Sequence, residues 1–160
     1  MISDLDLSLF EKPGRRQIAE AMEVMERAFD PAFGEAWTAA QLAGLSGIPG
    51  CWLTLAQCGR TTVGFAMVRS IFDESELLLL AVDPAWRRQA VGRTLLGHAI
   101  ETARARGISF MHLEVRASNS AIALYKKMGF EQVNMRPAYY RGNDGKLHDA
   151  YSFRLDLEIS

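Results

Sequence analysis

The chain has 160 residues, of which 49 % are apolar and 23 % are charged, and its formal net charge is −1. These values are typical of a globular domain that can bury a core, and we expect one domain over residues 1–160. The small net charge excludes bulk attraction to nucleic acid or to an anionic membrane. The longest apolar run, residues 77–82, is too short to span a bilayer, and the acidic start carries no apolar signal segment. We therefore expect a cytoplasmic protein.

The first half of the chain is predicted to form a strand, two helices and a pair of strands. Apolar residues recur at helical spacing after the first strand, on the face formed by Ile18, Met22, Met25 and Phe29. Thr38 followed three residues later by Gln41 is a capping-box pattern and predicts the start of a short second helix. The predicted ranges are a strand over 2–9, a helix over 15–29, a helix from 38, and strands over 51–57 and 61–71.

The second half alternates strands and helices and closes with a hairpin. A central strand over 77–82 precedes a helix that ends at Gly107, a residue suited to the position after a helix end. A strand over 110–115 follows, and Asn119 is the predicted N-cap of a fourth helix. Strands over 130–135 and 149–158 complete the prediction, with residues 136–141 in the loop between them.

The turn at residues 87–92 predicts a binding site for a pyrophosphate. It joins a buried strand to an amphipathic helix, and the unpaired N–H groups at a helix start attract anions. Arg87, Arg88 and Arg93 add positive charge at the same place. The turn lacks the Gly-Lys-Ser/Thr ending of a Walker loop and the GxGxxG fingerprint of dinucleotide sites. A solvated basic loop is an equally good interpretation of this turn in isolation.

Two residues are candidates for acid–base chemistry. Glu114 lies on the polar face of its strand, and a carboxylate beside a pocket can serve as a general base. Tyr125 lies on the apolar face of its helix and can donate a proton to a leaving group. A solvent-facing carboxylate and a core tyrosine with a satisfied hydroxyl are the alternatives, and the sequence leaves both open.

The remaining reactive residues predict no further chemistry. Cys51 and Cys58 form neither a disulfide framework nor a zinc site and are expected to be reduced. His98 and His112 lack metal-ligand spacing and are interpreted as structural or solvated, while His148 is expected in a loop. We expect no metal, and no covalent enzyme intermediate.

The element order and two motifs resemble the GNAT acetyltransferases, which use acetyl-coenzyme A (acetyl-CoA). The family's pyrophosphate loop, Arg/Gln-x-x-Gly-x-Gly/Ala, matches residues 87–92, with Ala90 where the family usually has glycine. This alanine is tolerated where its φ is negative. A later motif matches residues 119–130 with one residue fewer between Asn119 and Leu124. The segments LEVRASN, ALYKKMGF and RPAYYRGNDGKLHDA most resemble the ribosomal-protein alanine N-acetyltransferase group.

This resemblance implies an α/β (α+β) GNAT fold, a mixed central sheet of about seven strands flanked by about four helices. It implies transfer of the acetyl group of acetyl-CoA to the N-terminal α-amino group of a protein such as a ribosomal protein, with Glu114 as base and Tyr125 as acid. The cofactor-binding residues that it implies are Leu80, Ala81, Val82, Arg88, Gln89, Ala90, Val91, Gly92, Arg93 and Asn119. Arg136, Tyr139 and Tyr140 are expected to contact the acceptor, because adjacent tyrosines offer rigid walls for a peptide.

Two other functions stay open at this point. One is acetylation of a small-molecule amine, and the other is a non-catalytic module that binds acyl-CoA as a regulator. No nucleic acid or membrane partner is expected.

Overall fold

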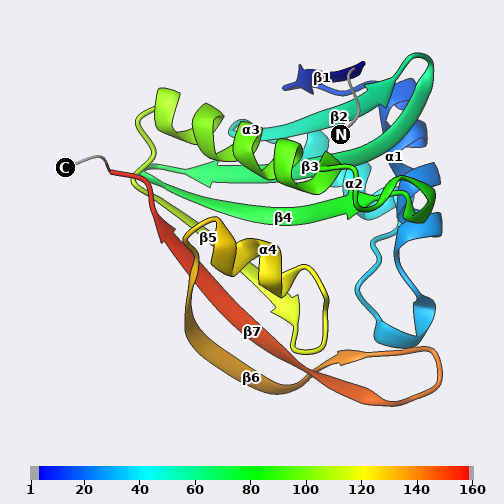
Figure 1. Ribbon diagram of the computed structural model, residues 1–160, viewed down its shortest axis with the longest axis vertical. Helices are drawn as coiled ribbons and strands as arrows, with labels where there is room; N and C mark the ends of the chain where they lie inside the picture. The colour runs from blue at the N-terminus through cyan, green and yellow to red at the C-terminus, as the bar shows by residue number, and fades with distance from the viewer. Residues whose placement is uncertain (1–3, 159–160) are drawn as a thin grey trace.

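The computed structural model describes residues 4–158 and shows a twisted sheet with helices on both of its faces (Figure 1). Four α-helices and two short 3₁₀ helices, η1 and η2, are present within this range. The elements are β1 (Leu5–Phe10), α1 (Arg15–Ala28), η1 (Pro31–Phe33), α2 (Ala39–Ser46), β2 (Cys51–Cys58), β3 (Thr61–Ile71), β4 (Glu74–Val82), η2 (Pro84–Trp86), α3 (Val91–Ala105), β5 (Phe110–Arg116), α4 (Ile122–Lys127), β6 (Glu131–Arg141) and β7 (Leu147–Asp156).

The sheet has seven strands in the order β1-β2-β3-β4-β5-β7-β6. All neighbouring strands are antiparallel except β4 and β5, which run parallel and pair only from Glu74 opposite Phe110 to Glu76 opposite His112. Beyond these three pairs the two strands diverge and open a gap in the middle of the sheet (Figure 1).

A β-bulge marks the place where β4 leaves β5. Leu79 pairs with Met67 of β3 and Leu77 pairs with Val68, so Leu78 is an extra residue in β4. An extra residue bends its strand and increases the local twist. The bulge therefore turns the second half of β4 away from β5, directly after their last paired residue, Glu76.

The core lies on both faces of the sheet. On one face, buried residues of α3 pack with residues of β5 and β7, among them Leu96, Met111 and Phe153. On the other face, α1 and α2 pack against the first four strands through residues such as Met25 and Leu42. This second face is left open over β5, β7 and β6 (Figure 1).

Several local predictions are confirmed. Thr38 caps α2 through both capping-box bonds, with Gln41 N donating to Thr38 Oγ1 at 3.1 Å and Thr38 N donating to Gln41 Oε1 at 2.8 Å. Gly107 follows the end of α3 with φ +75°. The predicted first strand is observed as β1 over Leu5–Phe10, and its first residues, 2 and 3, lie outside the described part.

The prediction for α1 is incomplete, and two predictions further along the chain are wrong. The predicted face of α1, Ile18, Met22, Met25 and Phe29, packs against the core, but only Met25 of these is fully buried, and Ala21 and Val24 complete the buried face. Residues 136–141, predicted as a loop, belong to strand β6. A shift in the pairing of β6 with β7 between Arg136 and Tyr140 accommodates Pro137, which has no N–H to donate. His148 likewise lies in β7 rather than in a loop.

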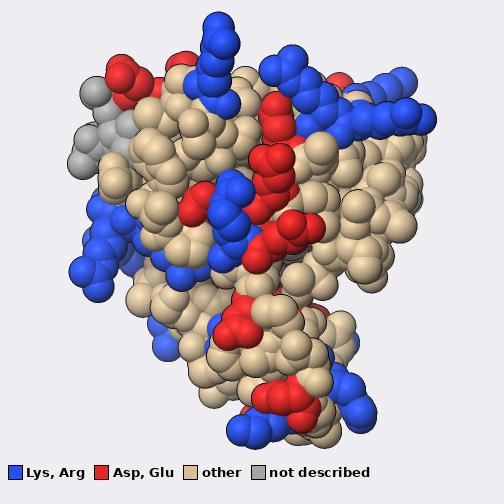
Figure 2. All heavy atoms as spheres, turned by 90° about the vertical axis from the view of Figure 1, so that its right-hand side faces the viewer, with Lys and Arg blue, Asp and Glu red and all other residues tan. Residues whose placement is uncertain are grey.

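No helix within residues 4–158 is long and apolar enough to cross a membrane. Figure 2 shows the side of the molecule that carries α1, where acidic side chains gather near the middle with basic ones among them. The described part of this side therefore offers no continuous basic surface.

Close packing of α3 on β3 depends on Gly64. A Cβ at this position would lie 2.9 Å from the Ala81 carbonyl oxygen and 3.0 Å from methyl carbons of Val91 and Leu95. We expect Gly64→Ala to lower the free energy of unfolding by roughly 1–3 kcal/mol, because α3 must move off the sheet. Gly97→Ala in the middle of α3 is the matched control, since its nearest neighbour would be the Met128 methyl at 4.0 Å.

Chemical denaturation of both variants measures this effect. Gly97→Ala should be neutral or stabilising by up to about 1 kcal/mol through helix propensity. Equal stability of the two variants would contradict the packing.

Candidate active site

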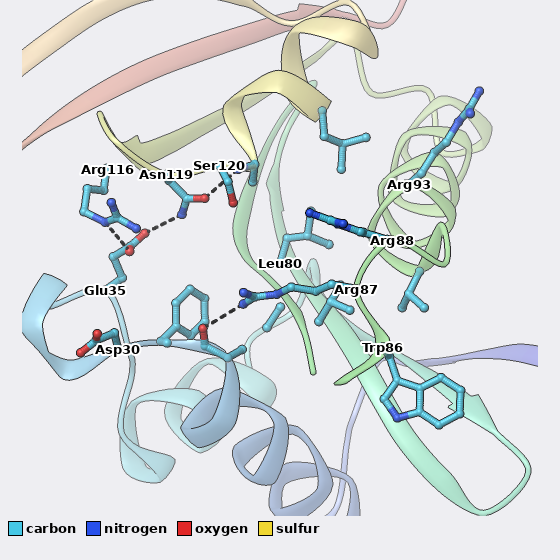
Figure 3. Close-up of a pocket in the computed structure, with 18 of the residues that line it drawn as sticks. Asp30, Glu35, Leu80, Trp86, Arg87, Arg88, Arg93, Arg116, Asn119 and Ser120 are labelled. Carbon is cyan, nitrogen blue, oxygen red and sulfur yellow. Dashed lines mark hydrogen bonds and ion pairs between the residues drawn. The ribbon is translucent and has the colours of Figure 1, made fainter. Parts of the chain in front are cut away.

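A cavity of about 460 Å³ lies between the end of β4, the start of α3 and the start of α4 (Figure 3). One side is closed by the end of α1 and by the segment that follows it, including Asp30 and Glu35. We call this space the outer cavity. It lies where the loop at residues 87–92 joins β4 to α3, at the site predicted for a pyrophosphate.

The backbone of this loop is shaped for an anion. Arg88 has φ +66° and Ala90 has φ +64°, so left-handed residues alternate with ordinary ones just before α3. Such alternation turns successive N–H groups toward one side and forms an anion-binding concavity. The first N–H groups of α3 lie beside it and have no partner within the helix. The positive φ of Ala90 is a conformation that favours glycine, so the negative φ that would make alanine tolerable is absent.

The three arginines at the loop and the first turn of α3 differ in what they contact. Arg87 Nη2 donates a hydrogen bond to the carbonyl oxygen of Ala28, at the end of α1, at 3.2 Å. Arg88 and Arg93 are exposed and form no hydrogen bond or ion pair within residues 4–158. Figure 3 shows Arg88 reaching toward the outer cavity and Arg93 projecting from the first turn of α3. Arg87 is thus a structural anchor, and the other two arginines are available to a ligand.

A smaller cavity of about 80 Å³ lies in the gap between β4 and β5, and we call it the inner cavity. Its walls are Leu77–Leu80 of β4 and Leu113–Val115 of β5, and Tyr125 of α4 and Tyr140 of β6 also line it. Phe29, Glu35, Leu80 and Asn119 line both cavities. The two spaces therefore adjoin, and a ligand in the outer cavity can extend one end into the gap.

Glu114 lies where the inner cavity meets a groove on the open face of the sheet. Its side chain is 23 % exposed, and Oε1 lies 3.2 Å from Arg136 Nε and accepts from Ser152 Oγ at 3.4 Å. The groove, of about 310 Å³, also contains Glu76 and Arg69. The carboxylate is thus accessible from the groove and from the inner cavity, rather than being a fully solvated surface group.

Tyr125 is buried and also lines the inner cavity. Its ring packs edge-on against Phe130, with centroids 5.9 Å apart, and against Phe153 at 6.4 Å. Burial, and after it the charges of Glu35 and Tyr140, raise the pKa of the Tyr125 phenol far above its ordinary value. Burial thus favours the neutral phenol, so the hydroxyl carries its proton at neutral pH.

Most of the predicted cofactor residues line the outer cavity. These are Leu80, Ala81, Val82, Arg88, Ala90, Val91, Gly92, Arg93 and Asn119, whereas Gln89 is not part of its lining. Asn119 is also not the N-cap of α4, which begins three residues later. Its Oδ1 accepts from Ala121 N at 2.8 Å and its Nδ2 donates to Glu35 Oε2 at 3.0 Å, so both polar ends of the amide have partners within the protein.

The three residues predicted to contact an acceptor are not equivalent. Tyr140 lines the inner cavity, and burial followed by the charges of Glu35 and Glu114 raises its pKa well above the usual range. Arg136 pairs with Glu114 and lies 5.2 Å from the centroid of the Tyr139 ring. Tyr139 is 49 % exposed and lines neither cavity.

Sequence reasoning missed Glu35. Its carboxylate forms an ion pair with Arg116, in which Oε1 lies 2.8 Å from Nε, and the two side chains are only 10 % and 11 % exposed. No motif or spacing indicates a contact between residues so far apart in sequence. Within residues 4–158 no group of three His, Cys, Asp or Glu residues is placed to hold a metal.

The model of the Acetyltransferase (GNAT) family matches residues 18–130. The chain belongs to this family. It is 42 % identical over 106 residues to the [ribosomal protein bS18]-alanine N-acetyltransferase of Escherichia coli K12, an alignment that covers 66 % of this chain and 70 % of that protein. The corresponding protein of Salmonella typhimurium is 46 % identical over 96 residues, which cover 59 % of this chain and 64 % of that protein.

Solved structures agree with this assignment. The crystal structure of the E. coli ribosomal-protein-S18-alanine N-acetyltransferase matches with a TM-score of 0.85 and 31 % identity, over 98 % of this chain and 96 % of that one. A Salmonella typhimurium structure that contains acetyl-CoA matches in fold, with a TM-score of 0.79 and 20 % identity over 99 % and 96 % of the two chains. The GNAT fold and the resemblance to the ribosomal-protein alanine group are confirmed, and the chain is an acetyl-CoA-dependent N-acetyltransferase.

The left-handed conformation of Ala90 gives a direct test of the loop geometry. We expect Ala90→Gly to raise the free energy of unfolding by up to about 1 kcal/mol, because glycine removes the steric cost of positive φ. Ala121→Gly is the matched control, since Ala121 has φ −66° and gains no such relief. Thermal or chemical denaturation compares the two, and a loss of stability in Ala90→Gly equal to that of the control would contradict the loop conformation.

Proposed function

We propose that this enzyme acetylates the N-terminal α-amino group of a protein, with a ribosomal protein as the acceptor class. The observation that carries the proposal is that Glu114 and Tyr125 both line one small cavity, which adjoins the outer cavity. The relatives named above, which act on alanine of a ribosomal protein, support the acceptor class.

The outer cavity fits the donor. Arg88, Arg93 and the N–H groups of the loop offer charge and hydrogen bonds to a pyrophosphate. Residues 80–82, along the diverging edge of β4, line the outer cavity, and in this proposal they flank the pantetheine arm that brings the acetyl thioester to the gap. The thioester supplies the acetyl group, and the chain's own residues handle the protons.

The acceptor amine must be neutral to attack. An α-amino group has a pKa near ~8, against ~10.4 for a lysine side chain, so about a tenth of α-amino groups but fewer than about one lysine in a thousand are neutral at pH 7. Glu114 takes the proton that the amine loses when it forms the new C–N bond. Tyr125 gives its proton to the sulfur as the C–S bond breaks, and solvent restores both groups.

The acceptor class is tested with three sets of amines. Peptides with free N-termini, including some that begin with alanine, are compared with N-terminally blocked lysine peptides and with small amines. We expect thiol release with the first set, and mass spectrometry should place the acetyl group on the α-nitrogen. Acetylation confined to lysine or small amines would contradict the proposal, and no thiol release with any acceptor would favour a non-catalytic acyl-CoA-binding module.

Arg88→Ala and Arg93→Ala should each weaken coenzyme A binding, because both guanidinium groups are free to meet phosphate. Calorimetry should show a smaller salt dependence of affinity in each variant. Arg16→Ala, which removes an 86 % exposed arginine of α1, is the matched control and should leave the affinity unchanged. If both variants bind coenzyme A as tightly as the wild-type protein, Arg88 and Arg93 are not part of the coenzyme A site.

Glu114→Gln should lower kcat by about 10²–10⁴-fold while coenzyme A binding survives, because the amide cannot accept the amine proton. Part of the loss should return at higher pH, where more of the amine is neutral. Glu76→Gln is the control, since Glu76 lies in the same groove and pairs with Arg69 at 2.8 Å much as Glu114 pairs with Arg136. Full activity of Glu114→Gln at neutral pH would exclude a base role.

Tyr125→Phe should slow transfer without unfolding the protein. The ring is retained, so the packing against Phe130 and Phe153 persists and the loss of stability should stay below about 1.5 kcal/mol. Tyr151→Phe, at a half-buried tyrosine that packs against the same core, controls for loss of a hydroxyl. A large fall in melting temperature with little change in kcat would show that Tyr125 is only a core residue.

A further inference from the structure

The segment between α1 and α2, residues 30–38, is fastened to the β6–β7 hairpin. Asn143 N donates to the carbonyl oxygen of Pro31 at 3.0 Å, and His148 Nε2 lies 3.2 Å from the carbonyl oxygen of Ala32. The two backbones touch, since a Cβ added at Gly34 or Gly142 would collide with a carbonyl group of the other segment. We call residues 30–38 the strap.

Glu35 fastens the strap to a second element, the end of β5. Its two carboxylate oxygens are used separately, Oε1 by Arg116 Nε at 2.8 Å and Oε2 by Asn119 Nδ2 at 3.0 Å (Figure 3). The Arg116 guanidinium also stacks over the Phe33 ring, 3.7 Å from its centroid. Arg116 therefore contacts the strap at two residues, Phe33 and Glu35. A charged pair with so little exposure is costly to break from one side only, because the remaining charge stays buried and unpaired.

The place of Glu35 connects this contact with the reaction. Glu35 lines both the outer and the inner cavity, so it lies where donor and acceptor must meet. It is not part of the proposed proton transfer, because the contacts of Glu114 are with Arg136 and Ser152. The strap instead forms the wall of the inner cavity that faces β5 through residues such as Trp37.

We propose that Glu35 is a positioning residue, which holds the strap against β5 through Arg116 and Asn119 and thereby fixes the acceptor entrance of the inner cavity. With the strap held, the side next to the hairpin is closed by backbone contacts, and the acceptor approaches along the groove beside Glu114. The expected effect of Glu35 on acceptor binding rests on the proposed function. The contacts that hold the strap against β5 do not depend on any substrate.

The test compares Glu35→Gln and Arg116→Lys with the wild-type protein in two measurements. Glu35→Gln removes the charge and keeps the size, whereas Arg116→Lys keeps the charge and loses the planar fork that meets both Glu35 and Phe33. Glu101→Gln is the matched control, because it removes an exposed carboxylate that pairs with Arg104 on α3. Hydrogen exchange of residues 30–38 is measured without substrate, and KM is measured for a peptide acceptor and for acetyl-CoA.

We expect exchange of the strap amides to become about tenfold faster or more in both variants, as local opening becomes easier. The acceptor KM should rise by about ten- to a hundredfold, since a small misplacement of a reacting group is costly, while the KM of acetyl-CoA changes less than about twofold. The control should match the wild type in both measurements. This split distinguishes positioning of the acceptor from a general loss of stability, which would alter both KM values.

Unchanged strap exchange in both variants would overturn the proposal, as would faster exchange with the two KM values raised equally. If Glu35→Gln does not fold, Arg116→Lys carries the same comparison. Faster exchange together with no acetylation of any peptide would contradict the proposed acceptor class and leave the holding of the strap supported. Normal peptide acetylation with unchanged exchange would contradict the role of Glu35 alone.

Discussion

The site depends on the early divergence of two parallel strands. β4 and β5 share only three residue pairs, and the extra residue Leu78 then bends β4 away from its neighbour. Backbone N–H and C=O groups inside a sheet ordinarily find partners on the next strand, and here those facing the gap do not. The inner cavity, the access of Glu114 to it and the approach of α4 with Tyr125 all follow from this separation. In the proposed function the donor arm occupies the same gap.

The outer cavity is bordered by strained backbone and by a charged pair with little exposure. Arg88 and Ala90 both adopt left-handed conformations at the mouth of the outer cavity, which is an unfavourable backbone for residues other than glycine. Glu35 and Arg116, which also line the outer cavity, form an ion pair whose two side chains are little exposed to solvent. Such features persist only where the surrounding structure fixes them, and here α1, β5 and the hairpin all contribute contacts. The rest of the fold therefore serves to hold a costly arrangement in place.

Local signals in the sequence were sufficient for most of the fold. Three kinds of signal depend only on neighbours within a few residues: the capping box at Thr38, the glycine after α3 and the alternation along the strands. These elements can therefore be predicted without knowledge of the tertiary structure. Glu114 and Tyr125, named from the motif resemblance, both line the inner cavity. Their chemical roles stay predictions.

Features that depend on distant contacts were missed or misplaced. The pairing of Glu35 with Arg116 joins the segment after α1 to the end of β5, and nothing in the sequence around Glu35 indicates this contact. Residues 136–141 were predicted as a loop, but pairing with β7 on both sides of a shift carries β6 through to Arg141. Asn119 was predicted to be the N-cap of α4, but α4 begins three residues later, and the Asn119 amide also donates to Glu35 of the strap. In each case a long-range contact decided the outcome against the local pattern.

The central claim is that the acetyl group passes to an α-amine inside the gap between β4 and β5, between Glu114 and Tyr125. The most direct measurement is a crystal structure of the enzyme with coenzyme A joined covalently to the α-nitrogen of an alanine-initiated peptide. We predict that the linked nitrogen lies between the Glu114 carboxylate and the Tyr125 hydroxyl, with the peptide leaving through the groove beside Glu114. A linkage held outside the gap, with both side chains distant from it, would contradict the account.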